Sequence, residues 1–144
     1  MRHVRMTVVA LAAAAAIVAC SDSNGPSGGL TGSYTLDSLK VDTAPALQPP
    51  IATGSLVFSA PSNFVAGIVL QPPAVPNPDS TITLAGTYTL KGADSIYLSV
   101  FGGVLTIPGT QVQTGNKLVL NVLIPPGLIG SGVTPTPVVL AWHK

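Results

Sequence analysis

The sequence predicts a small antiparallel β-barrel of about eight or nine short strands, and three observations support this. Short apolar runs rich in Val, Ile, Thr and Tyr follow one another after Gly29. Prolines fall between these runs, and proline is rare inside central strands. No window after Gly29 keeps a helical period long enough for a helix. Hairpin-length links favour an antiparallel barrel, with an immunoglobulin-like β-sandwich as the alternative.

The clearest strand spans residues 81–90, because apolar and threonine residues alternate strictly along it. Ile82, Leu84, Tyr88 and Leu90 should face the core, and the threonines between them should face solvent. Gly86 interrupts the apolar face and indicates a bend or bulge. The same reasoning gives strands, in chain order, at Gly32–Val41, 54–60, Asn63–Leu70, 81–90, 94–100, 104–107, Lys117–Ile124 and 138–144.

The connections differ in length and polarity. Three dipeptides are typical of tight turns, namely Lys91-Gly92, Gly102-Gly103 and Gly115-Asn116. Residues 72–79 and 125–137 form longer loops. Two loop segments, 44–51 and 125–133, are unusually apolar, and we expect their large side chains to plug a barrel end. Those side chains are Leu47, Ile51, Leu128 and Ile129.

The N-terminus has the order of a secretory signal peptide. Arg2 and Arg5 precede an uncharged apolar stretch at 6–18, and a Ser/Gly/Asn-rich segment follows Cys20. Ile17-Val18-Ala19-Cys20 resembles the bacterial lipobox. The resemblance implies cleavage of residues 1–19 and lipid on the Cys20 thiol and its new amino group. Residues 20–29 would then be a flexible tether, and residues 30–144 a single domain.

Composition and inventory exclude several functions. The net charge is +1 and only 8% of residues are charged, so there is no basic stripe for nucleic acid. The single cysteine cannot form an internal disulfide. His143 is the one histidine after Cys20, and no G-x-S-x-G elbow, zinc constellation or phosphate loop occurs. We therefore expect a protein that is not an enzyme and carries no metal or cofactor.

Two short motifs resemble the small bacterial lipocalin-like lipoproteins. GSYTLDS carries Gly32, Tyr34, Leu36 and Ser38, and GTYTLKGADSI carries Gly86, Tyr88, Leu90, Gly92 and Ile96. The segments 30–36 and 84–90 also echo one another. The resemblance implies that the first and final strands close the barrel. Tyr34 would then lie near Trp142, His143 or Lys144.

The function that these features imply is binding at a membrane surface. The anchored barrel would bind a small apolar ligand or another envelope component, and a packed structural module without a cavity is the alternative. Because Ser21 follows the lipidated cysteine, the resemblance favours the outer membrane in a diderm cell. A transmembrane barrel is not expected, because at 5% aromatic content the chain cannot supply the aromatic girdles.

Overall fold

The chain folds into a closed antiparallel β-barrel of eight strands, as a computed structural model shows for residues 29–74, 80–127 and 134–144. This confirms the predicted all-β class and the small lipocalin-like barrel, and the β-sandwich alternative is wrong. The strands are β1 (Gly32–Val41), β2 (Ala52–Ser59), β3 (Asn63–Leu70), β4 (Ser80–Lys91), β5 (Ser95–Val100), β6 (Leu105–Thr114), β7 (Lys117–Ile124) and β8 (Thr136–His143).

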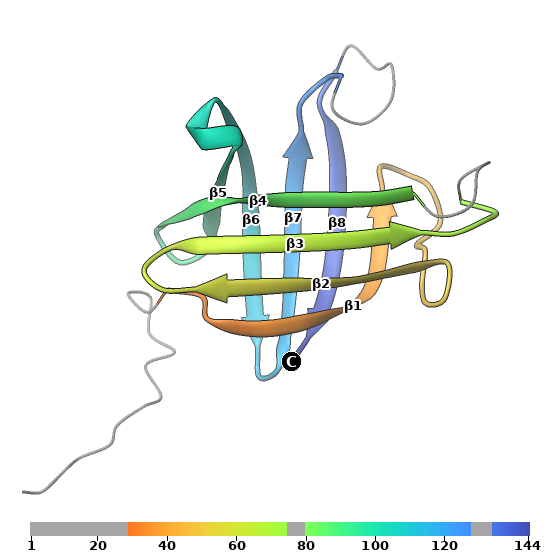
Figure 1. Ribbon diagram of the computed structural model, residues 1–144, viewed down its shortest axis with the longest axis horizontal. Coiled ribbons are helices and arrows are strands. Elements are labelled where there is room, and N and C mark those ends of the chain that lie inside the picture. Colours follow the sequence, from red (N-terminus) through yellow and green to blue (C-terminus); the bar gives the residue numbers. More distant parts are fainter. Residues whose placement is uncertain (1–28, 75–79, 128–133) are drawn as a thin grey trace, which may run out of the picture.

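Each strand pairs with its neighbours in sequence, and β1 pairs with β8 to close the sheet. In Figure 1 the strands β2, β3 and β4 run across β6, β7 and β8, so the barrel resembles two crossed layers. β1 and β4 belong to both layers. β1 pairs first with β2 and then, from Thr35, with β8. β4 pairs with β3 up to Thr87 and with β5 from Gly86.

Gly86 allows β4 to change partners. A side chain at this position would run into the backbone carbonyl of Ser99 on β5, so glycine permits an approach that other residues would block. The sequence predicts a bend or bulge at Gly86, whereas the structure shows a close approach of β4 to β5. The irregularity in register lies in β1 instead, between Leu36 and Ser38.

Three strands have the predicted bounds, and the largest error is at β6. The sequence pattern predicts only residues 104–107, because proline usually ends a strand, whereas β6 continues to Thr114. Pro108 pairs with Tyr97 of β5, and the pairing of β6 with β7 begins one residue later, at Gly109. Pro137 likewise lies inside β8 rather than in a loop, near the end of its ladder with β1. Both prolines sit where a ladder ends, so a missing N–H costs little.

The hairpin geometry explains why the β6–β7 ladder stops at Pro108. The turn Gly115-Asn116 joins Thr114 to Lys117, with Gly115 at φ +59°. In such a tight antiparallel hairpin, every second residue of β6, starting at Thr114 and going back toward the start of the strand, directs its backbone N–H and C=O toward β7. Position 108 falls in that set, and proline has no N–H to donate to Leu123.

Two further links are short. β4 leads into β5 through Gly92, which has φ +69°, and β5 leads into β6 through a 3-10 turn at Phe101–Gly103. Within the described ranges, no helix has the length and apolar character needed to cross a membrane. The predicted signal peptide at 1–19, Cys20 and most of the tether lie outside the described residues, as do Leu128 and Ile129.

Candidate functional site

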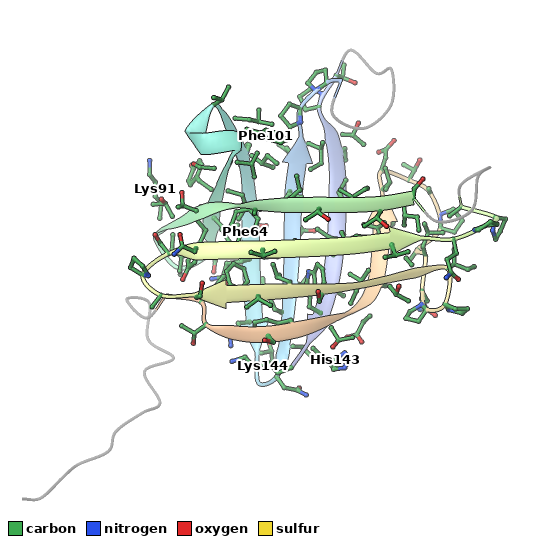
Figure 2. All side chains as sticks on the ribbon, in the orientation of Figure 1. Phe64, Lys91, Phe101, His143 and Lys144 are labelled. Atoms are coloured by element: carbon green, nitrogen blue, oxygen red, sulfur yellow. The ribbon has the colours of Figure 1, made fainter. Side chains whose placement is uncertain are left out.

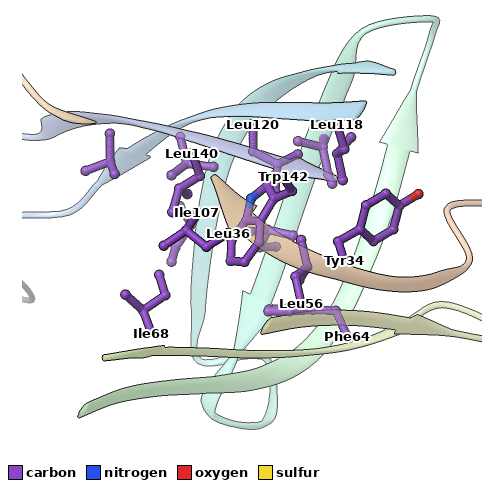
Figure 3. Packing of buried hydrophobic residues seen from close by; sticks show 14 of the residues in the cluster. Tyr34, Leu36, Leu56, Phe64, Ile68, Ile107, Leu118, Leu120, Leu140 and Trp142 are labelled. Carbon is purple, nitrogen blue, oxygen red and sulfur yellow. The ribbon is translucent and has the colours of Figure 1, made fainter. Parts of the chain in front are cut away.

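The barrel interior is apolar along its whole length. In the described part of the chain, every buried residue is hydrophobic and none is polar or charged. The alternation predicted for β4 is confirmed, because Thr81, Thr83, Thr87 and Thr89 are exposed while Tyr88 is buried. Figure 3 shows part of the core, to which all the labelled side chains contribute. Any site inside this barrel therefore offers little to a charged molecule.

One end of the interior is closed by aromatic rings. The Phe58 ring lies 6.1 Å from that of Tyr34 and 5.0 Å from that of Tyr88, both in edge-on geometry. Phe64 packs beside Phe58 at 6.5 Å. The Tyr88 hydroxyl donates a 2.7 Å hydrogen bond to the carbonyl of Leu30, which is itself buried. Burial is the main cause that raises the pKa of Tyr88 above its ordinary value of 10.0.

The other end of the interior is aliphatic and partly accessible. Ile82, Leu84 and Leu70 pack against the core yet remain only half-buried, although their positions in the alternation direct them inward. The register explains this, because β5 ends at Val100, opposite Gly86. No strand in the described residues pairs with Ser80–Ala85 on that side, so the inward side chains there lack a covering neighbour.

On β2, side-chain size falls toward this end. The inward positions of β2 change from Phe58 and Leu56 to Gly54 and Ala52. On β3, the residue after Phe64 on the inward face is Ala66. The loop after β1 closes part of this end, since Leu47 pairs with Leu39 through two backbone hydrogen bonds and packs against the core. Leu47 thus contacts the barrel end as predicted.

The strand closure brings together most of the residues singled out from the sequence. The Lys144 ammonium lies 5.2 Å from the centre of the Tyr34 ring, a cation–π contact. Trp142 lies opposite Leu36 in the β1–β8 ladder, and its side chain is only 1% exposed. His143 points outward. Tyr34 and Trp142 thus belong to the interior, while Lys144 and His143 lie at the C-terminal end of the chain (Figure 2).

The sequence missed the partner of His143. Its Nδ1 lies 2.5 Å from an Asp37 carboxylate oxygen, and both side chains are about two-fifths exposed, at 42% and 40%. The irregular register between Leu36 and Ser38 places Asp37 beside the last strand, which no spacing rule reveals. In the part of the chain that the structure describes, Asp37 is the one side chain that hydrogen-bonds to His143. Among the described residues, no side-chain hydroxyl is hydrogen-bonded to either member of this pair.

A shallow groove of about 340 Å³ lies on the outer side of β6, β7 and β8, where Pro108 ends the ladder. Pro108, Leu123 and Pro137 give it an apolar lining, and Asn121 donates a long hydrogen bond to Thr110 within it. No charged residue lines this groove. Within the described ranges there is also no group of three metal-ligating side chains.

The fold and interior define a class, a small closed β-barrel of lipocalin-like architecture with an apolar interior. Comparison with known proteins goes no further, because no protein-family model and no curated protein matches the chain.

Proposed function

We propose that this chain is a lipid-anchored protein of the bacterial envelope whose barrel binds a small apolar molecule without catalysing a reaction. The observation that carries the proposal is the half-buried aliphatic surface at the open end, formed by Leu70, Ile82 and Leu84. A guest covering these side chains would remove apolar area from water, which favours binding by about 25 cal/mol per Å². The aromatic end supplies a rigid floor.

The interior chemistry supports an uncharged guest. A bound ion would lose its hydration without meeting a buried partner of opposite charge. Ala66 is the small residue among the inward positions of β3, between Phe64 and Ile68.

A filling variant tests the binding site. Ala66→Phe places a ring among the inward aliphatic residues, and Val65→Phe is the matched control on the outer face, where Val65 is 51% exposed. We expect the uncharged fluorescent probe N-phenylnaphthylamine to bind the full chain and to lose about tenfold in affinity in Ala66→Phe. Val65→Phe should leave the affinity unchanged. Equal affinities in the two variants would rule out the interior as the binding site, and no binding would favour a purely structural module.

A second test concerns the anchor, which rests on Arg2, Arg5 and the Ile17–Cys20 motif. In a bacterial host, intact mass should show a mature chain that begins at Cys20 and carries lipid. Cys20→Ala should release the protein from the membrane fraction, because two or three acyl chains give anchoring that a protein surface alone does not. A Cys20→Ala protein still held at the membrane would contradict the lipid anchor.

A further inference from the structure

The interior contains a hydrogen-bond donor without an acceptor. Trp142 is 1% exposed, and its indole Nε1 has no hydrogen-bond partner among the residues that the structure describes. The contrast with Tyr88 is informative, because that hydroxyl is also buried but bonds to the carbonyl of Leu30. Native proteins rarely leave a buried N–H unpaired, so an orphaned donor inside the barrel suggests a missing partner.

Trp142 lies between the two ends of the interior. In Figure 3 its indole is drawn between Tyr34 and Phe64 on one side and Ile68 and Ile107 on the other. The first pair belongs to the aromatic end, and the second pair leads toward the half-buried aliphatic residues. An elongated guest that enters at the open end would therefore bring its leading group toward the indole.

This inference rests on the proposed function. We propose that the bound guest carries a neutral hydrogen-bond acceptor on an aliphatic body, and that the indole Nε1–H of Trp142 donates a hydrogen bond to this acceptor. An indole nitrogen can only donate, so its partner must be an acceptor such as a ketone or ester carbonyl. An ionised carboxylate is disfavoured, because the buried residues in the described part of the chain are all hydrophobic and include no cation. The proposal therefore selects neutral carbonyl compounds over fatty acids and over plain alkanes.

The indole nitrogen is sealed from solvent, so the acceptor reaches it by shifting a neighbouring aliphatic side chain. Such a shift repacks apolar groups against apolar groups and replaces an unpaired donor with a hydrogen bond. We expect methyl nonyl ketone to bind about tenfold more tightly than undecane, which has the same number of carbons, a difference of about 1.4 kcal/mol.

The chain's single tryptophan makes the test direct, because nitrogen-15 labelling gives one indole N–H resonance. In the full chain, methyl nonyl ketone should shift this resonance downfield and slow its exchange with water, and undecane should do neither. Trp142→Phe should bind the two compounds equally. Tyr34→Phe tests the other orphaned interior hydroxyl: a retained preference for the ketone assigns the contact to Trp142, and a lost preference would overturn that assignment.

The outcomes separate this inference from the proposed function. Binding of both compounds with equal affinity and an unmoved indole resonance would overturn the Trp142 assignment while the apolar site stands. Tighter binding of undecanoate than of the ketone would overturn the neutral acceptor. If neither compound binds, the proposed apolar site fails and the inference fails with it. If Trp142→Phe does not fold, the shift of the indole N–H resonance in the wild-type chain still tests whether Trp142 donates to the ketone.

Discussion

The two ends of the barrel interior are built from the same strands and yet differ in kind. At one end Tyr34, Phe58 and Tyr88 pack edge to face and leave little accessible surface. At the other end the inward residues are small or aliphatic and several are half-buried. The two ends differ because β5 stops opposite Gly86, which leaves Ser80–Ala85 without a second partner strand, and because the inward side chains of β2 become smaller toward that end.

The largest expected effect comes from removing the strand that both ends share. β8 pairs with β1 and β7 and supplies Val138, Leu140 and Trp142 to the core. Deleting residues 137–144 would expose two strand edges and open the core. We expect the truncated chain to lose cooperative thermal unfolding or to form oligomers in analytical ultracentrifugation. A monomeric truncation with an unchanged Tm would show that barrel closure contributes little to stability.

Equivalent truncations at the two ends should differ in cost. Phe58→Ala removes a fully buried ring that contacts three others, so we expect a loss of about 3–5 kcal/mol in the free energy of unfolding. Leu84→Ala acts on a half-buried side chain and should cost about 1–2 kcal/mol, because part of its surface already meets water. Thr83→Ala, on the solvent face, should stay within about 0.5 kcal/mol. Denaturant titration measures the free energy of unfolding of all three variants. Equal losses for Phe58→Ala and Leu84→Ala would show that the two ends of the interior are equally well packed.

The smallest effect is a pH dependence confined to the aromatic end. Burial raises the pKa of the Tyr88 hydroxyl, so above pH 10.0 the unfolded chain ionises first and binds fewer protons than the folded chain. Stability from this group is therefore present at neutral pH and falls as the pH rises past that point. Tyr88→Phe should lose about 1 kcal/mol at neutral pH, with the hydrogen bond to Leu30, and should show a shallower alkaline decline. Parallel alkaline profiles for the two proteins would contradict the assignment.

Much of the fold could be predicted from sequence because its signals are local. Alternation along β4 and β7 is set by neighbouring residues, and so is the Gly115-Asn116 turn. The echo between residues 30–36 and 84–90 also has a structural meaning, because these segments overlap β1 and β4, two of the strands that change partners along their length. Their tyrosines, Tyr34 and Tyr88, both pack edge-on against a shared neighbour, Phe58.

The features that the sequence did not reveal depend on how strands meet. Pro108 lies inside β6 because the β7 ladder ends beside it, and this depends on hairpin register. Leu84 is half-buried because β5 stops opposite Gly86, although its own pattern indicates full burial. Asp37 reaches His143 through an irregularity in β1. Side-chain identity determines which face is inward, but only the paired strands determine how deeply a residue is covered.

The hydrogen bond from Tyr88 to Leu30 has a mechanical consequence if the chain is tethered through Cys20. Tension on the tether would enter the barrel at Leu30, which is buried and held by a residue of β4. From there the load would pass along β1, which bonds to β2 over its first residues and to β8 over the remainder. Pulling a strand along its own axis loads these bonds together in shear instead of opening them one after another. Such an attachment would resist extraction of β1 from the barrel.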